Sequence, residues 1–440
     1  MLSLTYLFFG CVISILFILF IRYKIKRRIL STFSLFCIVY IFSYFFVPAY
    51  SSVYNYSRYG IEYSDMSKYI TLLYSILFFL FTLIYYMVFS KRFQTIRIIK
   101  IEEMKLKTFY FFGVICFCLC LFSLIKISSL IFSYGLNVFL SNRIILTSGM
   151  GYFQLLLYFP LLWTIVFVIE HFHIRSYTSW INYCKGILLV SAASLPLVVL
   201  GSRSNVLFGI IIYSFSVLVV LLKTGNINHF SRKIKKITLI LIGVILFGAS
   251  LGEVRQKLMA EDASNYATQE EKMPFESVVK AFSSYENLYW FFTDGNKTEL
   301  QYGGTLVSVF VGPIPRSIWS EKPTGGGPVM KNHISPGSYD LALGEKISSY
   351  TTGLPAEGYL NFGFIGVLIA PFILVLIVFL HESVLNNACN SLEIVVSVAL
   401  LLRILGFVNA EYYGVFIHIF VIVFFYASYR ITRVRFKCQF

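Results

Sequence analysis

The sequence predicts an all-α polytopic membrane protein, and three observations lead to this prediction. The 440 residues are 58% hydrophobic and 13% charged, whereas soluble domains are about 45–50% apolar and about 25% charged. Apolar runs recur along the whole chain, separated by short connectors. The basic residues gather in alternate connectors, as the positive-inside rule expects. One helical bundle accounts for the length, so no separate soluble domain is expected.

Eleven apolar runs approach the length of a membrane-crossing helix, about 20 mainly apolar residues. The first run has no basic residue before it and five after it, the reverse of a cleavable signal peptide, so we expect it to be retained. The second run is expected to end at Pro48. The runs are 4–21, 29–47, 69–89, 109–132, 152–169, 186–200, 206–222, 237–251, 360–380, 394–408 and 415–429.

The connector charges predict the orientation. The inner segments are 22–28, 90–107, 170–185, 223–236 and 430–437. They hold 22 Lys and Arg, against four in the alternate short connectors, at Arg58, Lys68, Arg143 and Arg203. The connector 381–392 has neither Lys nor Arg and is neutral. The pattern places the C-terminus in the cytoplasm, and the N-terminus and residues 253–358 outside.

Residues 253–358 form the only long polar stretch and carry seven of the eleven prolines. The expected parts of the chain are helices 1–8 (1–252), one large extracytoplasmic loop (253–358), and helices 9–11 with a basic tail (359–440). In the loop, 275–292 has a helical apolar stripe and is expected to lie as one helix in the headgroup layer. Residues 303–319 are expected to form a re-entrant or interfacial segment. Residues 321–340 are rich in Gly and Pro and are expected to form a mobile loop.

Several other classes of protein do not fit the composition. The net charge of +16 lies in short connectors, so nucleic acid is not an expected partner. The spacing of Cys116, Cys118 and Cys120 scatters their side chains around a helix, which indicates packing rather than a metal site. We find no His, Asp, Glu and Cys cluster that predicts a metal, and we expect no cofactor.

Charged residues near the outer membrane boundary are the candidates for function, because burying a charge there is unfavourable. Four arginines qualify: Arg143, Arg203 in the tight turn GSRSN, Arg316, and Arg403 inside an apolar run. A guanidinium matches phosphate geometry, so arginines gathered at the outer leaflet would suit a lipid-linked pyrophosphate. The structural alternatives are snorkelling to the interface and, for Arg403, pairing with Glu411 or Glu357.

Two further residues in or beside the loop can carry proton chemistry. Glu357 lies where the chain re-enters the membrane, and could accept a proton from a sugar hydroxyl or hold an arginine. His333 is the only histidine of the loop and is a candidate base, with a solvated loop position as the alternative.

Three stretches, GSRSNVLFGIIIY, VGPIPRSIWSEKP and GLPAEGYLNFGFIGVL, together resemble the oligosaccharide repeat-unit polymerases of the Wzy, or O-antigen polymerase, type. SNRIILTSGMGYFQLLL adds to the likeness. The hydropathy layout agrees over essentially the full length, and the order of the motifs is more specific than any one of them.

The resemblance implies a fold similar to the C-type glycosyltransferases and an enzyme of the bacterial cytoplasmic membrane. Such enzymes join repeat units carried on undecaprenyl pyrophosphate into O-antigen or capsule at the outer face. Expected partners are lipid-linked oligosaccharides, membrane lipids, a chain-length regulator and a flippase. The resemblance implies that Arg143, Arg203 and Arg316 bind pyrophosphate and that Glu357 organises or deprotonates the acceptor. Our further candidates for substrate binding are Arg403, Lys322, His333 and Tyr359.

Two alternatives to this function stay open. An O-antigen ligase has similar topology but a different acceptor. A transporter or flippase of polysaccharide intermediates would need a charged central cavity and two comparable halves. The acidic pair of metal-dependent C-type enzymes is not found in the first outer connector, which holds only Glu62 and Asp65. We therefore expect a metal-independent reaction.

The orientation can be tested at Ser338 in the long loop. A cysteine introduced there should react with a membrane-impermeant thiol reagent in intact cells, because the connector charges place residues 253–358 outside. Reaction only after lysis would invert the predicted topology.

Overall fold

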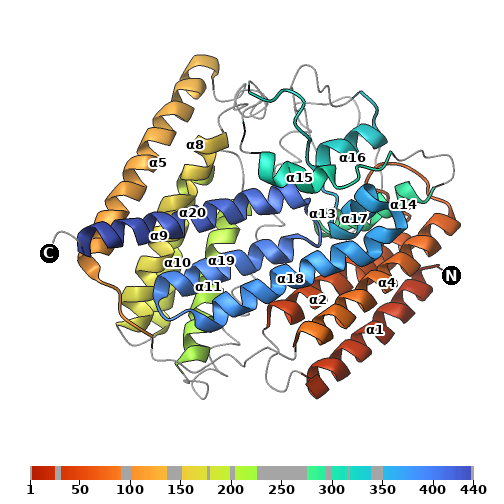
Figure 1. Ribbon diagram of the computed structural model, residues 1–440, viewed down its shortest axis with the longest axis horizontal. Helices are drawn as coiled ribbons and strands as arrows, with labels where there is room; N and C mark the ends of the chain where they lie inside the picture. The colour runs from red at the N-terminus through yellow and green to blue at the C-terminus, as the bar shows by residue number, and fades with distance from the viewer. Residues whose placement is uncertain are drawn as a thin grey trace. The chain divides into compact units, whose positions relative to one another are not determined.

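The computed structural model describes residues 2–24, 31–90, 101–135, 151–175, 179–198, 204–224, 275–293, 299–312, 314, 318–337 and 350–437. All the regular elements in these ranges are helical (Figure 1), as predicted. Six of the described helices are long and apolar enough to cross a membrane: Leu2–Ile21, Thr32–Val53, Asp65–Phe89, Leu106–Tyr134, Leu354–Asn387 and Tyr412–Arg433. The expected span at 237–251 lies outside the described residues, so the count of eleven stays a prediction.

The chain divides into two compact units, each described below by itself. The first comprises Met1–Thr95, Arg255–Ser383 and Arg403–Ile417. The second comprises Ile96–Val254, Val384–Leu402 and His418–Phe440. The boundaries between the two units fall inside the last three helices, α18 (Gly366–Asn387), α19 (Ser391–Gly406) and α20 (Tyr412–Lys437).

The first unit is built on apolar helices with an aromatic core. They are α1 (Leu2–Lys24), α2 (Thr32–Ile41), the π-helix η1 (Phe42–Phe46), α3 (Val47–Val53), α4 (Asp65–Ser90) and α17 (Leu354–Phe362), which leads through η5 (Gly363–Ile365) into α18. Tyr40 stacks on Tyr44 of η1 at 4.6 Å and on Phe78 of α4 at 5.3 Å between ring centroids. Such pairs add to the gain from apolar burial, and they join α2 and η1 to α4.

The second apolar run does not end at Pro48, as we had expected, but continues to Val53. Pro48 is the second residue of α3 and has no N–H to donate to the preceding helical turn. The π-helix η1 immediately precedes it, and such wider turns are common points of adjustment inside helices.

The long polar stretch also differs from the sequence prediction. Residues 275–292 form α13 (Glu276–Ala281), the 3₁₀ turn η4 (Ser283–Tyr285) and α14 (Glu286–Phe291) rather than one helix, and 283–292 are buried within the unit. Tertiary contacts of α14 with α4 and α17 override the simple amphipathic stripe. The expected mobile loop at 321–340 is also wrong in part, because Gly326–Ile334 forms α16. The remaining short helix is α15 (Gly304–Val311).

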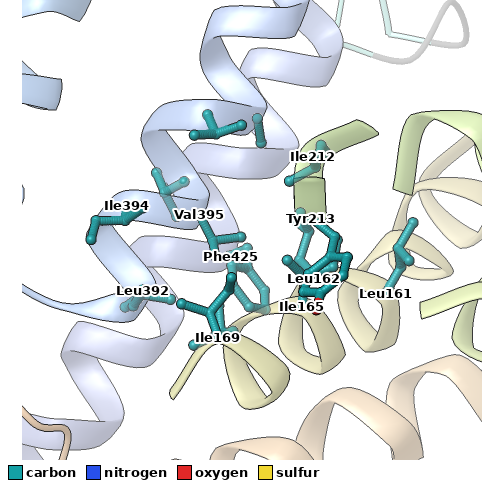
Figure 2. Close-up of a cluster of buried hydrophobic side chains, with 14 of the residues drawn as sticks. Leu161, Leu162, Ile165, Ile169, Ile212, Tyr213, Leu392, Ile394, Val395 and Phe425 are labelled. Carbon is teal, nitrogen blue, oxygen red and sulfur yellow. The ribbon is translucent and has the colours of Figure 1, made fainter. Parts of the chain in front are cut away.

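The second unit packs aliphatic side chains between helices. It contains α5 (Leu106–Tyr134), α8 (Gly151–Leu156), α9 (Tyr158–Ile169), the π-helix η2 (Glu170–Ile174), α10 (Trp180–Val198), α11 (Ser204–Lys223) and most of α19 and α20. Figure 2 shows Leu162 and Ile165 of α9, Ile212 of α11, Val395 of α19 and Phe425 of α20 in one buried cluster.

Connectors predicted to share the inner side meet within the second unit. The buried carboxylate of Glu170 accepts hydrogen bonds from the N–H of Met104 (3.0 Å), the Nε of Arg175 (2.9 Å) and the hydroxyl of Ser391 (2.8 Å). Three connectors therefore come together at one charge. These three connectors were predicted to lie on the same side of the membrane, and their contact agrees with that prediction.

Candidate functional site

The motif GLPAEGYLNFG (353–363) begins with a close backbone contact inside the first unit. Gly353 has φ +73°, and a Cβ there would lie 2.6 Å from the hydroxyl of Tyr44 and 2.8 Å from the carbonyl oxygen of Val408. The next N–H, of Leu354, donates to the carbonyl oxygen of Phe407 at 2.9 Å. Glycine is therefore required where the start of α17 passes the turn between α19 and α20.

Glu357, one turn into α17, is fully buried and holds the start of α20. Its Oε2 accepts the backbone N–H of Tyr412 at 2.7 Å and, more weakly, the hydroxyl of Thr352 at 3.4 Å. Tyr412 is the first residue of α20, so this N–H has no partner within its own helix. A carboxylate at a helix N-terminus also gains from the helix dipole, which helps to stabilise a buried charge.

A second carboxylate, Glu411, meets the three glycines that begin α16. It accepts the backbone N–H of Gly327. A Cβ on Gly325 would lie 2.6 Å from Glu411 Oε2, and one on Gly326 would lie 2.8 Å from Glu357 Oε1. The two carboxylates thus cap two different helices, and a side chain at Gly325 or Gly326 would collide with them. The glycine turn closes over Glu357.

Asn361 of the same motif joins α17 to α15. Its Nδ2 donates to the hydroxyl of Thr305 at 2.7 Å and to the carbonyl oxygen of Glu357 at 2.8 Å. Nearby, the N–H of Gln301 donates to the carbonyl oxygen of Leu360 at 3.0 Å. The segment that leads into VGPIPRSIWSEKP therefore lies beside GLPAEGYLNFG.

Lys322, predicted to bind substrate, instead contacts backbone. Its Nζ donates to the carbonyl oxygens of Gly312 and Ile314, at 2.6 and 2.5 Å. These contacts hold Lys322 against the backbone at residues 312 and 314. Its role toward a substrate stays a prediction.

The other predicted site residues lie in different settings. Tyr359 belongs to an aromatic cluster, 4.9 Å from Phe292 and 5.2 Å from Phe291 between centroids. His333 lies on α16 with its ring 5.7 Å from that of Trp290, not in a solvated loop. Burial lowers the pKa of His333, and the carboxylate of Glu299 opposes this shift.

Arg403 lies in the last turn of α19, within the first unit. Arg143, Arg203 and Arg316 lie outside the described residues. Among the described residues no group of three or more His, Cys, Asp or Glu lies together as a metal site would require.

Sequence reasoning missed Glu286 and Asn287, the adjacent buried pair that begins α14. Both carboxylate oxygens of Glu286 accept the backbone N–H of Arg58, at 3.1 and 2.9 Å. The side chain of Asn287 donates to the carbonyl oxygens of Thr351 and Thr352 and accepts from the hydroxyl of Tyr59. An acid next to an amide inside the aromatic stretch FSSYENLYWFF was the available signal.

No family model matches the chain, and no curated protein or solved structure matches it either.

The buried Glu286 predicts a pH-dependent stability. Burial raises the pKa of Glu286 from its ordinary value of 4.5 to about 7, against the opposing N–H and charge of Arg58. Because the folded state favours the protonated form, the stability from this group is complete below about pH 4.5 and is lost as the pH rises to about 7, a change on the order of 3 kcal/mol.

Thermal unfolding of the full chain in detergent should therefore show a melting temperature that falls between pH 5 and pH 8. Glu286→Gln should remove part of this fall, whereas Glu62→Gln, at an exposed carboxylate of the neighbouring connector, should retain it. Identical pH profiles for Glu286→Gln and the wild type would contradict the assignment.

Proposed function

We propose that this protein polymerises lipid-linked oligosaccharide repeat units into a surface polysaccharide at the outer face of the bacterial cytoplasmic membrane. The observation that carries the proposal is the contact between GLPAEGYLNFG and the segment that precedes VGPIPRSIWSEKP. Thr305 and Asn361, together with Gln301 and Leu360, place the segment leading into VGPIPRSIWSEKP beside GLPAEGYLNFG. The apolar helices support a membrane-embedded enzyme.

The proposed reaction transfers a growing chain from its lipid pyrophosphate to an incoming repeat unit. The bond between the anomeric carbon and the pyrophosphate oxygen breaks, and its electron pair leaves with the pyrophosphate. An acceptor hydroxyl oxygen forms the new glycosidic bond and gives up its proton to a base. Negative charge grows on the leaving pyrophosphate, so cationic donors that face it lower the barrier. We assign that part to Arg143, Arg203 and Arg316.

For Glu357 the geometry favours an organising role. Its carboxylate is enclosed by the N–H of Tyr412, the hydroxyl of Thr352 and the glycine turn at Gly326. A sugar hydroxyl would reach it only after this turn had moved. In this arrangement Glu357 fixes the start of α20 and packs against Gly326, and we propose that it thereby orders the backbone around the acceptor.

Substitution of Arg203 tests the proposal. Arg203→Ala should abolish long polymer, because loss of one donor to a developing charge lowers a rate by about 10²–10³-fold. The protein should still insert in the membrane, as detected by immunoblot of membrane fractions. The matched control is Lys68→Ala, which removes a cation that pairs with Asp65 at 3.7 Å and should leave the polymer unchanged.

The readout is the ladder of surface polysaccharide on a gel. Normal long chains in Arg203→Ala would overturn the assignment of this arginine. Loss of polymer in Lys68→Ala to the same degree would show that any outer cation has this effect.

A further inference from the structure

Three segments distant in the sequence meet at the ring of Tyr350. The guanidinium carbon of Arg58 lies 5.8 Å from the centroid of this ring and 5.4 Å from that of Tyr59. The ammonium of Lys331, on α16, lies 6.0 Å from the centroid of Tyr350. The two tyrosine rings are 4.7 Å apart and tilted by 47°. We name Arg58, Tyr59, Lys331 and Tyr350 the tyrosine platform.

The buried pair Glu286 and Asn287 fixes the position of the platform by hydrogen bonds. Glu286 fixes the backbone of Arg58, and Asn287 fixes the hydroxyl of Tyr59 and the carbonyl oxygen of Thr351, beside Tyr350. Both anchors are at most 1% exposed. One short helix therefore sets the relative positions of two of the three segments.

The two charged residues of the platform are partly exposed. No ion pair among the described residues includes Arg58. A guanidinium has five N–H donors, and the hydroxyl of Thr351 accepts one of them from Nη1 at 3.0 Å. Glu286 contacts Arg58 through its backbone N–H rather than the guanidinium. Two cations held beside one ring repel each other, and a bound anion that contacts both would relieve that repulsion.

The residue types define the ligand chemistry. Arginine presents a planar fork that matches phosphate oxygens, and lysine adds a compact positive charge. The amphipathic tyrosine rings offer apolar faces beside these charges, against which the C–H face of a sugar can pack. Lys331 follows Gly326 by five residues, about 8 Å along α16 from the turn that covers Glu357.

We infer that the tyrosine platform binds the sugar-diphosphate end of a lipid-linked oligosaccharide, with Arg58 and Lys331 on the diphosphate and the tyrosine rings against the first sugar. This inference rests on the proposed function, in which the donor and the acceptor each bring a pyrophosphate to the enzyme. Arg143, Arg203 and Arg316 take one pyrophosphate, and the platform takes the other.

The test measures equilibrium binding of inorganic pyrophosphate to the full chain in detergent, with stoichiometry. The wild type should bind two per chain, and the double variant Arg58→Ala with Lys331→Ala one. Each single substitution should weaken one site by about tenfold or more, because hydrogen bonds to charged groups are strong. Lys68→Ala, with its ion-paired cation, is the control and should bind like the wild type.

A second variant separates lost charge from lost packing. Arg58→Met keeps an unbranched chain against the two tyrosine rings but removes the guanidinium. At pH 5, where Glu286 is protonated, it should melt like the wild type. It should still lose pyrophosphate binding as fully as Arg58→Ala. Wild-type affinity and a stoichiometry of two in the platform variants would overturn the inference.

Nanodiscs with and without phosphatidylglycerol distinguish a glycosyl diphosphate from a lipid headgroup. If the platform variants weaken only the binding of phosphatidylglycerol, the site recognises a headgroup and the inference fails. The proposed function has its own test in the polymer ladder. Unchanged chain length, together with pyrophosphate binding that depends on Arg58, would remove the polymerase proposal and leave the diphosphate site.

Discussion

Two carboxylates, the buried Glu357 and the partly buried Glu411, hold together the part of the first unit where the chain leaves and re-enters its apolar helices. Glu357 takes the first N–H of α20, and Glu411 takes an N–H at the start of α16. Each thus satisfies a group that the helix itself leaves without a partner. Replacing either acceptor would leave a buried donor unsatisfied, which costs about 1–3 kcal/mol. The glycines at 325 and 326 follow from this arrangement, because a Cβ there would occupy the space of the carboxylates.

The same requirement explains why polar residues are concentrated at the breaks between helices. A backbone that is buried away from water must find partners inside the protein. In the first unit these partners are Asn287 for residues 351–352, Asn361 for Thr305, and Lys322 for the carbonyl oxygens of Gly312 and Ile314. Lys322, which was predicted from the sequence to bind substrate, thus contacts backbone. The charged groups of Arg58 and Lys331 lie beside the partly exposed rings of Tyr59 and Tyr350.

The sequence was most informative where one physical effect dominates. Helices such as α1, α4 and α5 followed from hydropathy alone, because a long apolar run has few other stable states. It was least informative where tertiary contacts decide. The continuation of the helix past Pro48, the division of 275–292 into three segments and the helix α16 depend on more than the local sequence pattern. Glu357 was singled out from the sequence, but its enclosure by Tyr412 and Gly326 depends on two distant segments. Arg143, Arg203 and Arg316 lie outside the described residues, so their roles remain predictions.

Deletion of the gene, followed by sizing of the surface polysaccharide, tests the central claim most directly. If the protein joins lipid-linked repeat units, the deletion strain should carry products of a single repeat, and a copy of the gene should restore the long chains. Unchanged long chains at the surface would contradict a polymerase. Full-length chains retained on the lipid carrier would also contradict it, because they would place the lost step after polymerisation and indicate a ligase.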